Sequence, residues 1–314
     1  MNSASLNSAS LNWFELAGNW ILLPPRPIAI LHFLGGAFIA AAPQVTYRRL
    51  LETIAQQGYV IVATPFVNTF DHVSIAETVL WNFDRAHYAL QDRYLAQRHL
   101  PIYGIGHSMG CKLHLLIGSL FEVERQGNIL ISFNNFAAKD SIPLMEQLSQ
   151  VMESFSTNLA PEFTPSPQET NEMILRQYAI SHNLLVKFSN DNLDQTRSLS
   201  GLLEDRFAQG TTIVKLKGNH LTPVTQDFNR ASAPFAALNS LGQNLRQNLR
   251  QTLGQTLGQT LEDTWAIGQS FGQSSIGQWM QQGMVGEIAA LEQAILDWLP
   301  NYHSGQDGLK LGRG

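Results

Sequence analysis

A serine between two glycines is the first candidate for chemistry in this sequence. Residues 106–110 read Gly-His-Ser-Met-Gly, which matches the pattern Gly-x-Ser-x-Gly with Ser108 at its centre. In a nucleophile elbow this pattern places the serine on a tight turn between a strand and a helix, where only small residues fit beside it. An apolar run at 101–105 precedes the pattern and a helix-forming run follows it. We therefore expect Ser108 to be the nucleophile of an acyl-transfer reaction.

A second match to the same pattern lies at residues 268–272, with Ser270 at its centre. This match sits in a stretch rich in glutamine and glycine, and no strand pattern precedes it. Because an elbow needs a strand before the serine and a helix after it, we attribute the second match to chance.

The partners of an elbow serine follow it in the order acid, then histidine. His220 lies in a glycine-containing loop just after an apolar run, where an imidazole can reach a serine at the same sheet edge. The acid is expected in the loop 189–194, where Asp191 is preferred because an aspartate followed by x-Leu is common at this point of the fold. Asp194 is the alternative acid, although it could instead cap the next helix. Asp140, after the preceding predicted strand, is a third candidate.

Two backbone N–H groups are expected to hold the oxyanion of the acyl-transfer intermediate. One belongs to the residue after the nucleophile, which is Met109. The other should come from residues 32–38, which read His-Phe-Leu-Gly-Gly-Ala-Phe and follow an early apolar run. Leu34 is the preferred donor, and Phe33 and Gly35 are the alternatives.

Short apolar runs alternate with helical patterns along the chain, which predicts an α/β fold with a mostly parallel central sheet and crossover helices. The predicted strands are 20–23, 28–33, 59–64, 102–105, 128–133, 184–188 and 211–216. The predicted helices are 46–57, 75–98, 111–123 and 285–299. The candidate serine, acid and histidine each follow a predicted strand, so we expect them to meet at one edge of the sheet.

Residues 1–12 repeat the unit Asn-Ser-Ala-Ser-Leu, which cannot bury a core, and we expect them to be disordered. Residues 13–314 are expected to form a single domain. Within it, the Met-, Phe- and Pro-rich stretch 139–181 is predicted to be a helical lid, with an ordinary crossover connection as the alternative. A second, low-complexity insertion with leucine at every fourth residue is expected at about 229–284, before the last helix. A protein partner could bind there, although nothing else in the sequence supports one.

The composition excludes several classes of function. A net charge of −5 and a pI near 6.0 provide no basic surface for nucleic acid. One cysteine, Cys111, rules out an internal disulfide framework, and the histidines lack the paired spacings of zinc sites. We therefore expect neither a metal nor an organic cofactor. No secretory signal pattern and no apolar run of membrane-spanning length are visible, so the expected location is cytoplasmic or stromal.

Several motifs together resemble the α/β-hydrolase superfamily, and more narrowly an uncharacterised hydrolase-like family of cyanobacteria and plant chloroplasts. These motifs are residues 32–38, Thr-Phe-Asp-His at 69–72, Gly-His-Ser-Met-Gly-Cys-Lys-Leu-His at 106–114 and Ser-Phe-Asn-Asn-Phe at 132–136. The resemblance covers roughly residues 13–228 and the last helix. It implies an α/β-hydrolase fold, and it leaves the substrate open.

The expected function is that of a serine hydrolase in which Ser108, His220 and Asp191 act on an ester or thioester. The Met- and Phe-rich stretch 139–181 indicates an apolar small-molecule substrate. Carboxylesterase, thioesterase and lipase-like activities all fit this expectation. The alternative is a non-catalytic binding or scaffold protein that has kept the α/β-hydrolase fold.

Overall fold

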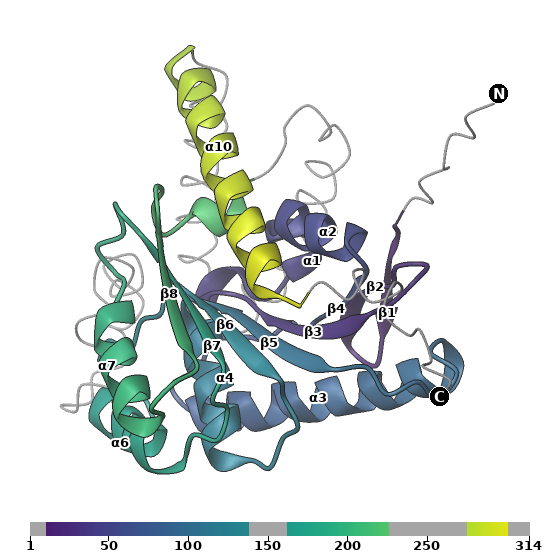
Figure 1. Ribbon diagram of the computed structural model, residues 1–314, viewed down its shortest axis with the longest axis horizontal. Helices are drawn as coiled ribbons and strands as arrows, with labels where there is room; N and C mark the ends of the chain where they lie inside the picture. Colours follow the sequence, from purple (N-terminus) through teal and green to yellow (C-terminus); the bar gives the residue numbers. More distant parts are fainter. Residues whose placement is uncertain (1–10, 138–161, 226–274, 301–314) are drawn as a thin grey trace, which may run out of the picture.

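The structure is a computed structural model that describes residues 11–137, 162–225 and 275–300 (Figure 1). The predicted N-terminal repeat and the leucine repeat lie almost wholly outside the described residues. No helix in the described part of the chain is long and apolar enough to cross a membrane.

An eight-stranded sheet forms the centre of the molecule, with the order β1-β2-β4-β3-β5-β6-β7-β8. The strands are β1 (Trp13–Leu16), β2 (Asn19–Leu22), β3 (Ala29–Leu34), β4 (Tyr59–Ala63), β5 (Ile102–His107), β6 (Gly127–Ile131), β7 (Asn183–Phe188) and β8 (Thr211–Leu216). β2 is antiparallel to both of its neighbours, and all other pairs are parallel. This mostly parallel sheet, with crossover helices and an elbow after β5, is the α/β-hydrolase fold.

Helices cover both faces of the sheet (Figure 1). One face carries α1 (Pro43–Thr46), α2 (Arg48–Gln56) and α10 (Ser275–Trp298), and the other carries α3 (His72–Arg93), α4 (Met109–Leu120), α6 (Pro167–Gln177) and α7 (Thr196–Arg206). The central strands are apolar at nearly every position because both of their faces are buried under helices. Two single-turn 3-10 helices, η1 (Ala37–Ile39) and η3 (Thr222–Val224), lie in the loops after β3 and β8.

The sequence does not predict strand β1, which forms a hairpin with β2 at one edge of the sheet. The hairpin turns at Ala17 and Gly18, whose φ angles are 50° and 78°. Positive φ at both central residues is typical of the turns that suit the twist of a hairpin. Since β1 has four residues and is only half-buried, it leaves a weak apolar pattern in the sequence.

The predicted lid at 139–181 is described only from residue 162. In this part, α6 begins at Pro167 with a capping box made by Ser166 and Glu169, and it packs against α4 and α7 on the flank of the sheet. The described part holds a helix between β6 and β7, and the lid and its alternative, an ordinary crossover connection, both stay predictions. Residues 139–161, including Asp140, lie outside the described residues.

The last helix begins earlier than the sequence predicts. α10 starts at Ser275 instead of 285, so the end of the predicted low-complexity insertion at 229–284 is helical. Ile288, Leu291 and Ile295 of α10 pack into the core on the α2 side of the sheet. α10 also contacts η3, and through it the loop that carries His220.

Candidate active site

Ser108 occupies the sharp turn between β5 and α4, with φ 54° and ψ −117°. A non-glycine residue rarely adopts this conformation, and such strain is common at reactive residues. The two flanking positions have no room for a side chain. A Cβ on Gly106 would lie 2.6 Å from the backbone carbon of Gly110, and a Cβ on Gly110 would lie 2.0 Å from the carbonyl oxygen of Leu34. The turn therefore forms only with glycine at both positions.

Three of the predicted site residues meet at the carboxyl ends of β5, β7 and β8. His220 Nε2 lies 3.0 Å from Ser108 Oγ, and His220 Nδ1 lies 2.9 Å from Asp191 Oδ2. Ser108 and Asp191 are buried and His220 is half-buried. This is the arrangement of a nucleophile, a base and an acid that orients the base.

The protonation state of this series follows from the surroundings of Asp191. Burial opposes its ionisation, but the hydrogen bond and charge of His220 and the N–H of Leu193 hold the pKa of Asp191 below its ordinary value. An ionised carboxylate accepts hydrogen bonds only, so His220 donates its Nδ1–H to Asp191. The Nε2 atom of His220 is then free to accept the hydroxyl proton of Ser108.

Asp194, the alternative acid, has different partners. Its Oδ2 atom lies 2.6 Å from Lys187 Nζ, and its Oδ1 atom accepts the backbone N–H of Thr196 at 2.6 Å. The carboxylate therefore holds the start of α7 and pairs with a lysine of β7. Both aspartates lie in the loop after β7, but the structure brings Asp191 and not Asp194 to His220.

The loop after β3 passes beside the nucleophile. Leu34 is the last residue of β3 and pairs with Gly106, whereas a Cβ on Gly36 would lie 3.4 Å from Ser108 Cβ. Met109 is the first residue of α4, so its N–H lies at the positive end of the helix dipole. The assignment of Met109 and Leu34 as oxyanion donors stays a prediction, and Gly36 shows that the loop comes within contact of Ser108.

A buried chain of hydrogen bonds connects the loops around Ser108. Tyr47 Oη accepts the Gly36 N–H at 2.8 Å and donates to His107 Nδ1 at 2.8 Å. His107 Nε2–H then donates to the carbonyl oxygen of His220 at 2.9 Å. Burial, followed by the charge of His220, lowers the pKa of His107 to about 3, so this imidazole is neutral. Nothing in the sequence pointed to Tyr47, which lies far from the motifs.

Asn134 is a further contact of the nucleophile that the sequence analysis missed. Its Nδ2 atom lies 2.9 Å from Ser108 Oγ, and it comes from the loop after β6, the strand next to β5. The signal that could have found it is its place in the motif Ser-Phe-Asn-Asn-Phe, directly after a predicted strand that neighbours the elbow strand.

Cys111 lies in the first turn of α4 and is fully buried. Burial is the main cause that raises the pKa of its thiol well above the ordinary value, and Sγ lies 3.2 Å from the carbonyl oxygens of Gly106 and Ile131, either of which can accept its one proton. It is therefore a packing residue and not a second nucleophile. Among the described residues, no cluster of three His, Cys, Asp or Glu side chains is arranged to hold a metal ion.

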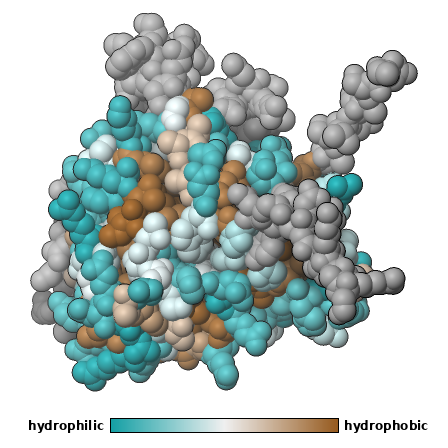
Figure 2. All heavy atoms as spheres, in the orientation of Figure 1, coloured by the Kyte–Doolittle hydropathy of each residue, from teal (hydrophilic) through white to brown (hydrophobic). Residues whose placement is uncertain are grey.

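Exposed apolar side chains lie on loops at the same sheet edge as Ser108. Val67 and Phe70 follow β4, and Leu221 follows His220 directly; their exposed fractions are 65%, 40% and 60%. On the face seen in Figure 2, hydrophobic patches interrupt a largely hydrophilic surface. Phe70 also packs on Phe163, with ring centroids 5.7 Å apart. An apolar group near Ser108 would find side chains of matching character on these loops.

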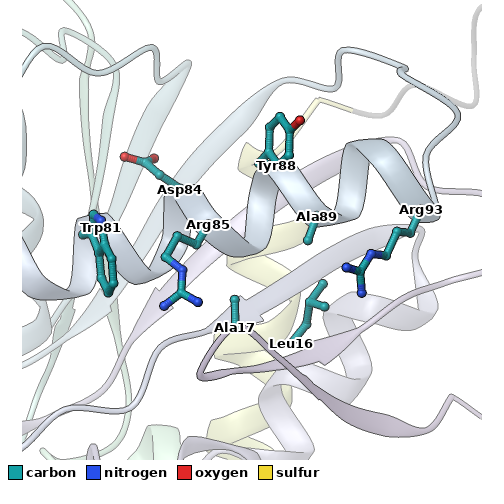
Figure 3. A pocket seen from close by; sticks show the side chains of 8 residues that line it. All are labelled: Leu16, Ala17, Trp81, Asp84, Arg85, Tyr88, Ala89 and Arg93. Atoms are coloured by element: carbon teal, nitrogen blue, oxygen red, sulfur yellow. The ribbon is translucent and has the colours of Figure 1, made fainter.

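A surface pocket of about 480 Å³ lies away from this site, between α3 and the β1–β2 turn (Figure 3). Trp81, Arg85, Tyr88 and Arg93 of α3 line it, and Arg85 lies over the Trp81 ring. Neither Ser108 nor His220 nor Asp191 borders this pocket, so it does not belong to the site around Ser108.

Comparisons with known proteins give one family match. A family model described as "Protein of unknown function (DUF1350)" matches residues 12–263, a range that includes Ser108, Asp191 and His220. No curated protein matches the chain.

Among solved structures, the chain is similar to the thioesterase domain from the curacin biosynthetic pathway, with 18% identity and a TM-score of 0.43 over 74% of this chain and 98% of that one. It is also similar to an esterase of Pyrococcus furiosus, with 15% identity and a TM-score of 0.47 over 73% and 85% of the two chains. A third similar structure is carboxyl esterase 2 of the fungus Tuber melanosporum, with 14% identity and a TM-score of 0.46 over 74% of this chain and 85% of that one.

Proposed function

The chain belongs to the family described as "Protein of unknown function (DUF1350)", and we propose that it is a serine hydrolase that cleaves an ester or thioester. One observation carries the proposal. Asp191, His220 and Ser108 form a continuous hydrogen-bonded series, with 2.9 Å and 3.0 Å between its members, on a strained elbow turn. An arrangement of this kind activates a serine hydroxyl that is otherwise a weak nucleophile.

The reaction proceeds by acyl transfer. His220 Nε2 takes the hydroxyl proton of Ser108 while Oγ attacks the carbonyl carbon, and Asp191 stabilises the imidazolium that forms. The N–H of Met109 and one from the loop after β3 hold the oxyanion. When the tetrahedral intermediate collapses, His220 passes the proton to the departing alcohol or thiol, and an acyl-serine remains.

Water then hydrolyses the acyl-serine, with His220 acting again as base and then as acid. His220 takes a proton from the water, whose oxygen attacks the acyl carbon. The bond between that carbon and Ser108 Oγ then breaks, and Oγ recovers its proton from the imidazolium. A carboxylic acid leaves, and no metal or organic cofactor takes part in this sequence.

The substrate that fits best is apolar. Val67, Phe70 and Leu221 offer exposed hydrophobic side chains on the loops around the nucleophile. The substrate screen uses p-nitrophenyl esters and acyl thioesters with acyl chains of roughly two to sixteen carbons, and it should favour the longer chains. Each two-carbon extension that is buried against these side chains should stabilise binding by about 1.6 kcal/mol. Turnover confined to short, charged acyl groups would contradict this choice.

A fluorophosphonate probe tests the proposal, because it reacts with activated serines and needs no knowledge of the substrate. The purified full chain is labelled beside Ser108→Ala, His220→Ala and Ser270→Ala. We expect no labelling of Ser108→Ala, labelling at least about 100-fold slower in His220→Ala, and unchanged labelling of Ser270→Ala. Ser270 is a matched control because it lies in the second copy of the same pattern.

Two outcomes would count against a serine hydrolase. Labelling that survives in Ser108→Ala would place the reactive group elsewhere. A folded wild-type chain that does not label at all would favour the alternative, a binding protein that has kept the fold. The narrower resemblance to a family of cyanobacteria and plant chloroplasts, the cytoplasmic location and a partner at 229–284 stay predictions.

A further inference from the structure

Ser108 Oγ has two polar neighbours, His220 Nε2 at 3.0 Å and Asn134 Nδ2 at 2.9 Å. The serine hydroxyl has one proton, and this proton points to His220, because the Nδ1–H of His220 is used by Asp191. Oγ must therefore accept from its second neighbour. This requirement places the amide nitrogen of Asn134, and not its oxygen, against the nucleophile.

The fold holds Asn134 in place from both sides. Before it, β6 is tied to the elbow because the Ser108 N–H donates to the carbonyl of Ile131 at 2.9 Å, and the chain then turns at Ser132 with φ 52°. Phe133 is 2% exposed and packs in the core beside α4, α6 and α7. After it, Asn135 is buried and donates to the carbonyl of Pro167 and to Oδ1 of Asn171 at 3.0 Å and 3.1 Å.

The hydrogen bond from Asn134 gains strength as the reaction proceeds. A neutral amide donates only an ordinary hydrogen bond to a hydroxyl, but it donates a charge-assisted one to an oxygen that carries negative charge. Oγ carries that charge twice: when His220 removes its proton, and when the acyl carbon–Oγ bond breaks and Oγ keeps the electron pair. A contact that is stronger in the transition state than in the ground state raises the rate and not the affinity.

We propose that Asn134 is a further catalytic residue, which stabilises the charge on Ser108 Oγ in both halves of acyl transfer. This role rests on the proposed serine hydrolase function. An amide suits it because it donates a hydrogen bond at every pH and cannot take the proton that must go to His220.

The first test compares Asn134→Ala with Asn192→Ala, a matched control on an exposed amide beside Asp191. The second-order rate constant of fluorophosphonate labelling is measured for both. We expect labelling about 10- to 100-fold slower in Asn134→Ala, the range for a lost hydrogen bond to a charged group. Asn192→Ala should label like the wild type. With an ester identified by the screen, kcat should fall by a similar factor while KM changes less than about threefold.

The second test uses Asn134→Asp, which keeps the shape of the side chain and replaces the donor by a carboxylate. An ionised carboxylate cannot donate to Oγ, and its charge favours protonated His220. The acid limb of the pH–rate profile should therefore move to higher pH by about one unit in Asn134→Asp. It should stay in place in Asn134→Ala and in Asn192→Asp, which adds the same charge at the exposed position. An acid limb that stays in place in Asn134→Asp would show that this side chain does not lie beside Ser108 and His220, and would overturn the proposal.

The outcomes separate this role from the proposed function. Ser108-dependent labelling of the wild type, together with labelling of Asn134→Ala within about threefold of it, would overturn the role of Asn134 and leave the hydrolase intact. A wild type that does not label would overturn both. If Asn134→Ala melts well below the wild type, the isosteric Asn134→Asp decides the question through its labelling rate above the acid limb, and a rate within about threefold of the wild type there would overturn the role.

Discussion

Asp191 and Asp194 lie in one loop after β7, and their carboxylates have different partners. Asp191 accepts from His220 Nδ1 at 2.9 Å, whereas Asp194 contacts Lys187 Nζ and the N–H of Thr196, each at 2.6 Å. The first contact orients the base of the proposed reaction. The second pair of contacts holds the loop itself.

Substitution by asparagine should therefore affect the labelling rate at Asp191 and the stability of the fold at Asp194. Asp191→Asn should slow fluorophosphonate labelling by about 10³- to 10⁴-fold, because an amide no longer keeps His220 in the tautomer that accepts from Ser108. Asp194→Asn should label normally, but its free energy of unfolding should fall by about 3 kcal/mol because Lys187 loses its partner. Labelling rates and urea denaturation measure the two effects. The acid would be Asp194 if the activity loss followed that residue instead.

At the scale of elements, three loops from distant parts of the chain must be held in register around Ser108. The chain Gly36–Tyr47–His107–His220 makes this connection with side chains and backbone groups that are buried or half-buried. Tyr47 supplies both a donor and an acceptor to it, and its ring packs on Phe33 with centroids 4.6 Å apart. The residue thus links the end of β3, the elbow and the loop of the base.

Tyr47→Phe removes the hydroxyl and keeps the ring. Two buried groups, the Gly36 N–H and His107 Nδ1, then lose their partner, which should lower the free energy of unfolding by about 1–3 kcal/mol. Labelling should slow by about tenfold, since the loop of the expected oxyanion donors is no longer tied to the elbow. Tyr59→Phe is the matched control, because the Tyr59 hydroxyl lies on the same core and donates to Pro300 O at 3.0 Å. Equal labelling of the two variants would show that the Tyr47 hydroxyl serves stability alone.

At the scale of the whole molecule, several imidazoles are buried in a neutral form. Burial, and then the charge of Arg125, lowers the pKa of His32 and His114 well below the ordinary value. Burial is also the main cause that lowers the pKa of His72 and of His107 to about 3. Each of these side chains would have to take up a proton on unfolding in mild acid.

The sign of the effect follows from proton binding. Below pH 6.5 the unfolded chain binds more protons than the native one at these histidines, so stability falls as the pH falls. Together the four neutral histidines should lower the free energy of unfolding by roughly 5 to 6 kcal/mol at pH 5.5. Urea denaturation at pH 7.5 and pH 5.5, at equal ionic strength, should show a loss of this order. A difference below about 1 kcal/mol would contradict neutral burial of the four rings.

The α/β architecture can be predicted from the sequence because burial of a strand on both faces leaves a local signature. Each strand from β2 to β8 coincides with an apolar run in the sequence. Strand β1 is not predicted, because an edge strand of four half-buried residues leaves no such run. The stretch 139–181 was harder to interpret. Its composition indicates a lid, which stays a prediction because residues 139–161 lie outside the described part, while α6 packs its buried face, with Thr170 and Ile174, on α4 and α7.

The sequence by itself determined the elbow at Ser108 and the loops where its partners should lie, because glycines at a tight turn and apolar runs in buried strands leave local patterns. Only the tertiary structure decided which side chain in each loop reaches the nucleophile. From the sequence, Asp194 remains an alternative to Asp191, and neither Asn134, although it lies in the motif at 132–136, nor Tyr47 is predicted to be a site residue. Contacts between residues as far apart as Ser108 and His220 depend on which strands are neighbours and on how each loop turns, and no local pattern records either.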